Sequence, residues 1–254
     1  MQIRAIGTTD QGKIRDHNED NFIINEKESL FLVADGMGGL SKGDVASRIA
    51  VETIKHFIIQ SRVEDITWPI KPQKKYSLEE NRLLAAISLA NWKIYSESQN
   101  DVENRGMGTT LTGFLIDNEQ LAIANVGDSR SYLMRDENIE QLTNDHSLVM
   151  EEVRRGNMTI EEARNHPQKH VINRALGISE SLLVDIFPFE FQPDDIFLLC
   201  SDGLSDMVSD EEMLSLIQSN KEASLEELGR ILIHAALENG GKDNVTAVLV
   251  NFYN

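Results

Sequence analysis

The stretch Leu30-Phe31-Leu32-Val33-Ala34-Asp35-Gly36-Met37-Gly38-Gly39 joins a short apolar run to an aspartate in a glycine-rich turn. The run is typical of a buried strand, and the Asp-Gly pair is typical of a tight turn, because glycine accepts a positive φ. Taken alone, such a pair predicts a turn and nothing more.

Three further aspartates stand at the same kind of junction between an apolar run and a turn. Asp128 follows the run at residues 121–126, Asp202 follows the run at 196–200, and Asp243 precedes the run at 245–250. If these strand ends converge, they bring four carboxylates together. Carboxylate oxygens are the hard ligands that Mg²⁺ and Mn²⁺ prefer, so the pattern predicts a metal site.

The composition argues against several classes of partner. The 254 residues include 24 Lys and Arg and 42 Asp and Glu, which gives a net charge of −18. An acidic chain repels phosphate backbones and anionic lipid, so we expect no nucleic-acid partner and no membrane partner. No apolar run approaches the ~20 residues that cross a bilayer, and the first residues lack the apolar core of a signal peptide. These features favour a cytoplasmic enzyme, and a monomer is the default expectation.

The single cysteine, Cys200, lies inside the apolar run Phe197-Leu198-Leu199-Cys200. No internal disulfide is possible with one cysteine. Because a cysteine in such a run is typical of a small buried hydrophobic side chain, the sequence argues against a cysteine nucleophile.

Helix starts are marked by capping residues. Ser77 and Ser224 each begin a capping box, Thr159 begins a shorter helix in the same way, and Ser41 and Asp44 stand at a similar spacing. Ser209 caps a short helix, and another is expected at residues 148–154.

Between the helices the pattern predicts strands and loops within one domain, residues 1–254. Residues 61–76 predict a loop, the pair Asp117-Asn118 predicts a turn, and the irregular segment 144–177 predicts a mobile flap. Runs of strands with paired helices indicate an α+β fold, in which helices cover the outer faces of antiparallel sheets. Further strands are expected at residues 3–9, 21–25, 109–116, 131–134 and 184–189.

Six motifs, in order and over nearly the whole chain, resemble those of the metal-dependent (type 2C) serine/threonine protein phosphatases in their compact bacterial form. The motifs are Arg15-Asp16-His17-Asn18-Glu19-Asp20, Ala34-Asp35-Gly36-Met37-Gly38-Gly39, Met107-Gly108-Thr109-Thr110, Val126-Gly127-Asp128-Ser129-Arg130, Ser201-Asp202-Gly203-Leu204 and Asp243-Asn244-Val245-Thr246. The resemblance implies a four-layer αββα sandwich, with two antiparallel β-sheets flanked by helices.

The resemblance also implies a site with two Mn²⁺ or Mg²⁺ ions and a third, weaker one. Asp35 is expected to bridge the two ions, and the Gly36 carbonyl to complete one of them. Asp202 and Asp243 are expected to bind the first ion, while Asp202 and Asp128 hold the third. Glu19 and Asp20 act through metal-bound waters, and Arg15 clamps the substrate phosphate. The catalytic set is thus Arg15, Asp35 and Asp202.

The implied reaction is attack of a metal-bridged hydroxide on the phosphorus of phosphoserine or phosphothreonine in proteins, with no covalent intermediate. Two cations would lower the pKa of the shared water and neutralise the phosphate oxygens. Many eukaryotic members have a histidine, thought to protonate the leaving group, where this chain has Met37. The general acid is therefore unassigned: a metal-bound water, or one of the flap histidines His146, His166 and His170, could serve.

Other interpretations remain open at this point. Arg15 is also compatible with an exposed loop arginine, and His17 is more typical of a surface histidine than of a base. The alternative role of Asp16 is to fix its loop rather than to bind metal, and residues 107–110 more simply begin a core strand. The chain could be a catalytically silent module that binds phosphoproteins, or a hydrolase of small phosphomonoesters. The family resemblance favours phosphorylated proteins as partners, including a serine/threonine kinase.

Overall fold

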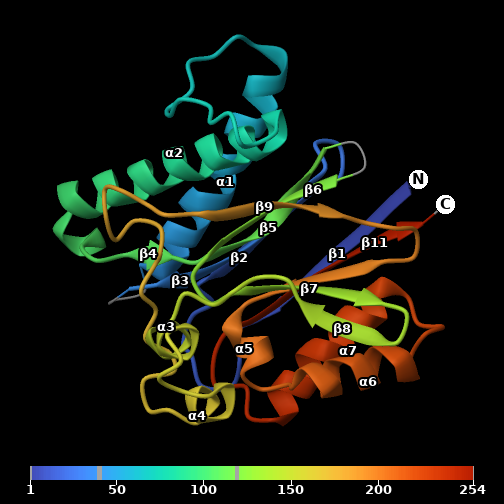
Figure 1. Cartoon of the computed structure of the whole chain (residues 1–254). Coiled ribbons are helices and arrows are strands. Elements are labelled where there is room, and N and C mark those ends of the chain that lie inside the picture. The colour runs from blue at the N-terminus through green and yellow to red at the C-terminus, as the bar shows by residue number, and fades with distance from the viewer. Residues whose placement is uncertain (1, 39–41, 118–119, 254) are drawn as a thin grey trace.

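Two antiparallel sheets form the centre of the molecule (Figure 1). The computed structural model describes residues 2–38, 42–117 and 120–253. The first sheet has the strand order β1-β11-β10-β7-β8. Its strands are β1 (Gln2–Asp10), β11 (Val245–Tyr253), β10 (Ile196–Cys200), β7 (Arg130–Arg135) and β8 (Asn138–Gln141).

The second sheet has the order β2-β3-β5-β6-β9, and β4 pairs with β3 beside this path. Neighbouring strands in both sheets run antiparallel. The strands are β2 (Asp20–Asn25), β3 (Leu30–Met37), β5 (Leu111–Asp117), β6 (Gln120–Val126), β9 (Asp185–Glu190) and β4 (Gly108–Thr109).

Helices cover the outer faces of the sheets (Figure 1). The helices α1 (Gly43–Val63) and α2 (Leu78–Asn100) share a hydrophobic core with the second sheet, and α6 (Asp210–Ser219) and α7 (Leu225–Glu238) share one with the first. A third core lies between the sheets and is rich in phenylalanine, including Phe31, Phe114, Phe197 and Phe252. These layers confirm the predicted αββα sandwich.

The predicted helix caps are largely confirmed. Ser77 and Ser224 form complete capping boxes at the starts of α2 and α7, and Thr159 does so at α4 (Ile160–Arg164). Ser209 accepts a hydrogen bond from the Glu212 backbone at the start of α6. Ser41 lies outside the described residues, and α1 has Lys42 as its N-cap without a side-chain cap bond.

Some boundaries differ from the prediction. The loop expected from residue 61 begins later, because α1 continues to Val63. The short elements β8, η1 (Val102–Asn104) and α5 (Asp202–Ser205) were not predicted. Asn118, in the predicted turn, lies outside the described residues. Within the described ranges, every helix is too short or too polar to cross a membrane.

The segment 144–177 contains α3 (Leu148–Arg154) and α4, and its two ends are joined by backbone hydrogen bonds. The Leu148 N–H donates to the Val171 carbonyl (2.8 Å), and the Asn173 N–H donates to the His146 carbonyl (2.8 Å). The first and last parts of the predicted flap are therefore hydrogen-bonded to each other.

Candidate active site

The four aspartates at strand ends line one pocket of about 560 Å³. Asp35 lies near the end of β3, Asp128 precedes β7, Asp202 begins α5 directly after β10, and Asp243 precedes β11. Strands from both sheets thus contribute to a single acidic pocket, as the sequence predicted. Arg15, Glu19 and Gly36 line it as well.

The position of Asp35 is set by hydrogen bonds from the opposite chain segment. Its N–H donates to Thr110 Oγ1 (3.0 Å), and its carbonyl accepts from the Thr110 N–H (2.9 Å) and from Thr109 Oγ1 (2.9 Å). The Thr110 hydroxyl also shares a hydrogen bond of 2.7 Å with Ser129 Oγ, beside Asp128. Thr110, expected only to begin a core strand, therefore lines the pocket and connects two of its aspartates.

The glycines of two Asp-Gly pairs are required by close packing. A Cβ atom on Gly36 would lie 2.1 Å from the Gly43 carbonyl oxygen and 2.6 Å from that of Glu19. A Cβ atom on Gly203 would lie 2.0 Å from the Asn244 carbonyl oxygen. Backbone segments can approach the aspartates this closely only because no side chain stands between them.

Asp20 is buried behind the pocket and does not line it. It is the cross-strand partner of Asp35, and its Oδ2 accepts hydrogen bonds from Ser201 Oγ and Thr246 Oγ1, both 2.7 Å. Among the described residues, its other oxygen, Oδ1, is buried without a hydrogen-bond partner, as is Oδ1 of Asp202. Because leaving a buried acceptor unpaired is costly, these oxygens fit a site completed by a cation and its waters.

The electrostatics of the pocket favour the same conclusion. Burial raises the pKa of Asp20 to about 7, against the hydrogen bonds from Thr246 and Ser201. Burial and then the Asp243 charge raise the pKa of Asp202 to about 6, and burial with neighbouring carboxylates raises the pKa of Asp35 and of Asp128. Like charges held this close call for a compensating positive charge.

Arg15 provides one positive charge. Its Nη2 donates to Asp243 Oδ2 (2.7 Å), while about half of the side chain is exposed (54%). The loop that carries it is fixed by Asn244, whose Nδ2 donates to the carbonyls of Gln11 (2.8 Å) and His17 (2.9 Å). Sequence reasoning gave Asn244 no role, although its place directly after Asp243 was a usable signal. His17 itself is exposed, as expected of a surface histidine.

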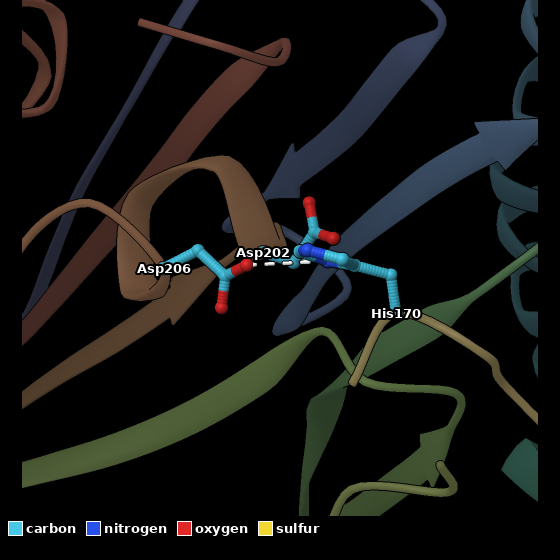
Figure 2. A group of neighbouring side chains, drawn as sticks. All are labelled: His170, Asp202 and Asp206. Carbon is cyan, nitrogen blue, oxygen red and sulfur yellow. Dashed lines mark ion pairs between the residues drawn. The ribbon is translucent and has the colours of Figure 1, made fainter. Parts of the chain in front are cut away.

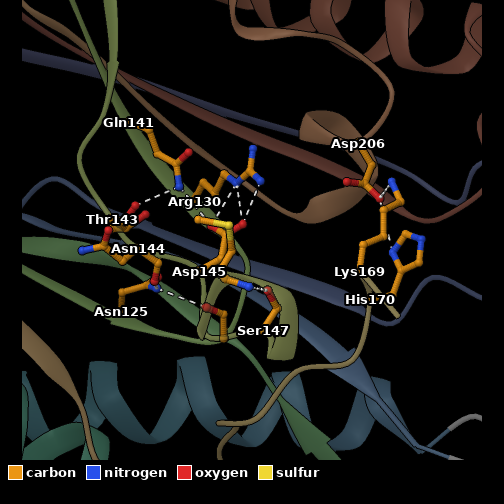
Figure 3. Close-up of polar contacts among 12 residues, drawn as sticks. Asn125, Arg130, Gln141, Thr143, Asn144, Asp145, Ser147, Lys169, His170 and Asp206 are labelled. Atoms are coloured by element: carbon orange, nitrogen blue, oxygen red, sulfur yellow. Dashed lines mark hydrogen bonds and ion pairs between the residues drawn. The ribbon is translucent and has the colours of Figure 1, made fainter. Parts of the chain in front are cut away.

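Across the pocket, the segment 144–177 contributes two further residues. Lys169 Nζ lies 3.0 Å and His170 Nδ1 lies 3.3 Å from Asp206 Oδ2 (Figure 3). One ligand atom from each of His170, Asp202 and Asp206 lies within 4.8 Å of the others (Figure 2). The sequence did not identify Lys169 or Asp206. Asp206 could have been found, since it lies four residues after Asp202, whereas nothing in the sequence pairs it with Lys169.

The three flap histidines occupy different environments. His170 lines the pocket, whereas His146 is fully buried and bonded to other groups. His166 accepts a hydrogen bond from the Gln168 N–H within the flap (3.2 Å) and does not line the pocket. Of the three candidates for a general acid, the structure brings His170 to the site.

The family of the chain follows from comparison with known proteins. Residues 12–246 match the family model described as protein phosphatase 2C. The chain belongs to this family. The serine/threonine phosphatase Stp of Listeria welshimeri is 42% identical over 250 residues, which cover 95% of this chain and 93% of that protein. The protein phosphatase PhpP of Streptococcus pneumoniae is 34% identical over 254 residues, covering 99% and 97%.

Solved structures of similar serine/threonine phosphatases have the same fold. The crystal structure of the serine/threonine phosphatase PstP/Ppp of Mycobacterium tuberculosis aligns with a TM-score of 0.87 at 35% identity, over 100% of both chains. A structure of the PstP catalytic domain in complex with two manganese ions aligns with a TM-score of 0.83 at 34% identity, over 99% of both.

Proposed function

We infer that the chain is a metal-dependent protein serine/threonine phosphatase and that the acidic pocket is its active site. The observation that carries this inference is the convergence of Asp35, Asp128, Asp202 and Asp243 on one pocket in a chain of the protein phosphatase 2C family. The similar proteins from Listeria and Streptococcus are named as phosphatases, which supports the same activity.

The cofactor is Mn²⁺ or Mg²⁺, with two ions in the core site. In our proposal Asp35 would be the ligand shared by both ions, the Gly36 carbonyl would serve one of them, and Asp202 and Asp243 would hold the first ion. Asp128 and Asp202 would hold a third. When bound, the cations supply charge neutralisation at the phosphate and a lowered pKa for a shared water. The two manganese ions in the related PstP domain support this number.

The protein groups around the proposed ion sites would orient the substrate phosphate and nearby waters and neutralise charge on the phosphate. Arg15 can meet two phosphate oxygens with its planar fork, because its loop is fixed by Asn244 and its side chain is half exposed. Glu19, which accepts from the Gly43 N–H (3.2 Å), and Asp20, which accepts from two hydroxyls, would act through metal-bound waters. His170 lines the pocket, and in our proposal it would hold a proton for the leaving oxygen.

The wider assignments follow from this activity. We propose that residues 1–254 form one catalytic domain in which residues 144–177 act as the flap. Its substrates would be phosphorylated proteins, including a serine/threonine kinase, within cytoplasmic signalling, and the working unit would be a monomer. The overall charge of −18 supports the expected absence of a nucleic-acid partner.

The test is phosphate release from a phosphothreonine peptide, with and without Mn²⁺, by the native chain and by Asp35→Ala. We expect release that depends on Mn²⁺ and falls at least a thousandfold in the variant, because loss of a bridging ligand removes transition-state stabilisation of roughly 4 kcal/mol or more. Asp65→Ala, in an exposed loop, is the matched control. A native chain that binds Mn²⁺ yet releases phosphate only from p-nitrophenyl phosphate would refute a protein substrate.

A further inference from the structure

His146 is a fully buried residue at the base of the flap, and the proposed reaction does not use it. Its two ring nitrogens have different partners. Nδ1 lies 3.1 Å from the backbone nitrogen of Gly127. Nε2 lies 3.1 Å from Asp185 Oδ2 and 3.3 Å from Arg174 Nη1.

These contacts fix the position of the ring proton. A backbone N–H can only donate, so Nδ1 must accept through its lone pair. The proton of the neutral imidazole is then on Nε2, where it can be donated to the Asp185 carboxylate. Burial lowers the pKa of His146 despite the opposing charge of Asp185, and the nearby Arg174 and Arg154 act in the same direction as burial. The neutral ring is therefore the form that the surroundings favour.

Gly127 is hydrogen-bonded to His146 through both its N–H and its carbonyl oxygen. The His146 N–H donates to the Gly127 carbonyl (2.9 Å), while the Gly127 N–H donates to the His146 ring. Gly127 has a φ of +104°, a conformation that L side chains rarely adopt. The next residue in the chain is Asp128, which lines the pocket.

Neighbouring side chains join the same two segments (Figure 3). Asn125 Nδ2 donates to the Asn144 carbonyl (3.2 Å) and to the Gly127 carbonyl (3.2 Å). Arg130 forms a two-pronged ion pair with Asp145, with its shortest contact at 2.7 Å. These contacts, made by residues before and after Asp128, thus hold the turn that carries Asp128 against the first residues of the segment 144–177.

We propose that His146 is a positioning residue for Asp128. As a neutral ring protonated on Nε2, it holds the Gly127–Asp128 turn against the base of the flap and so fixes where the Asp128 carboxylate enters the pocket. That Asp128 serves a metal ion rests on the proposed function, whereas the joint between turn and flap does not. On the side away from Gly127, Asp185 Oδ2 accepts from Nε2, and Arg174 Nη1 donates to Asp185 Oδ1 (2.9 Å) and so holds that carboxylate in place.

The wild-type protein provides the first test. Nitrogen-15 NMR distinguishes a protonated imidazole nitrogen from a bare one. We expect His146 at pH 7 to show a protonated Nε2 and a bare Nδ1. A protonated Nδ1 would overturn the proposal, because the Gly127 N–H could then not bond to the ring. This measurement requires no variant and so does not depend on whether a substituted chain folds.

The second test compares His146→Asn with His146→Gln. The amide oxygen of asparagine can occupy the place of Nδ1 and accept from Gly127, whereas the longer glutamine places its polar atoms near Nε2. We expect His146→Asn to keep slow hydrogen exchange at the Gly127 amide and an Mn²⁺ affinity within about threefold of wild type. His146→Gln should speed that exchange and weaken Mn²⁺ binding by about tenfold, a loss typical of substitutions at residues that orient metal ligands. His234→Asn and His234→Gln, at an exposed site on α7, are the matched controls.

Equal exchange rates and equal Mn²⁺ affinities in the two His146 variants would show that the ring only fills space, and would refute the proposal. Neither amide exchange nor the imidazole spectrum depends on catalysis. A wild-type chain that lacks phosphatase activity would therefore refute the proposed function alone.

Discussion

At the scale of single residues, Arg15 differs in charge from the carboxylates of the pocket that surround it. It places a guanidinium among carboxylates, and its hydrogen bond to Asp243 raises the pKa of Arg15 further above its usual value. The side chain therefore remains charged at any pH at which the protein is folded. The bond to Asp243 holds the guanidinium at the pocket while half of the side chain stays exposed.

Replacing Arg15 by lysine should test whether the planar fork matters or only the charge. Arg15→Lys keeps the charge but can offer no two-pronged contact to phosphate. We expect kcat/KM for a phosphothreonine peptide to fall about thirtyfold, which corresponds to about 2 kcal/mol for a charge-assisted hydrogen bond. Steady-state kinetics would measure this, with Arg105→Lys, at an exposed site, as the control. Unchanged kcat/KM would show that Arg15 is an ordinary loop arginine that does not contact the substrate phosphate.

At the scale of elements, His146 and Asp185 lie where the segment 144–177 contacts the turn after β6. We call this contact the joint. Protonation of either group opposes folding. The pKa of His146 is lowered by burial, and that of Asp185 is lowered by His146 and Arg174 although burial alone would raise it. A lowered pKa adds stability that is present above the value of the unfolded chain, about 6.5 for histidine, and is lost as the pH falls through the folded value. Asp185 loses its contribution at still lower pH.

The joint should therefore weaken in mild acid. We expect the stability advantage of wild type over His146→Asn, measured by urea unfolding of metal-free protein, to shrink as the pH falls from 7 to 5. The comparison is made between variants at each pH, because the raised pKa values of the pocket aspartates act in the opposite direction. His234→Asn should follow wild type throughout. An advantage that grows toward pH 5 would contradict the assigned sign.

The elements also show what can and cannot be predicted from a sequence. The strand at 196–200 and the capped helices follow from local signals, namely an apolar run between polar residues and a Ser-x-x-Glu box. β8 was missed because Asn138–Gln141 is short and half exposed, so no apolar run marks it. The four acidic ligand candidates were found because a turn next to a buried strand, after it for three of them and before it for Asp243, is visible in the local sequence. Lys169 and Asp206 contact each other only in the tertiary structure, so no local sequence signal indicates that they form a pair.

At the scale of the whole molecule, the net charge of −18 is concentrated in part around one pocket. The folded chain must hold several carboxylates close together, and their raised pKa values reflect the cost of doing so. A divalent cation that binds only the folded state would offset that repulsion and increase the stability of the entire domain.

Thermal unfolding should accordingly depend on metal. At free Mn²⁺ near 100 times its Kd, linkage adds about 2.7 kcal/mol to the free energy of unfolding. For a chain of this size we expect the Tm to rise by roughly 5–10 °C, reversibly on addition of EDTA. Asp35→Ala should show little of this rise, whereas Asp65→Ala should show all of it. Calorimetric scans that are identical with Mn²⁺ and with EDTA would exclude a metal site in the folded chain.

The place of β11 in the first sheet has a consequence for biosynthesis. β11 pairs with β1 over Gln2–Asp10 on one side and with β10 on the other, so the last of the described strands in chain order lies inside the sheet. A growing polypeptide cannot complete that sheet until residue 253 has left the ribosome. Until then β1 and β10 lack the strand that joins them, and Arg15 lacks Asp243. The pocket is therefore assembled only after translation of the domain, in a step that closes contacts over more than 200 residues of chain.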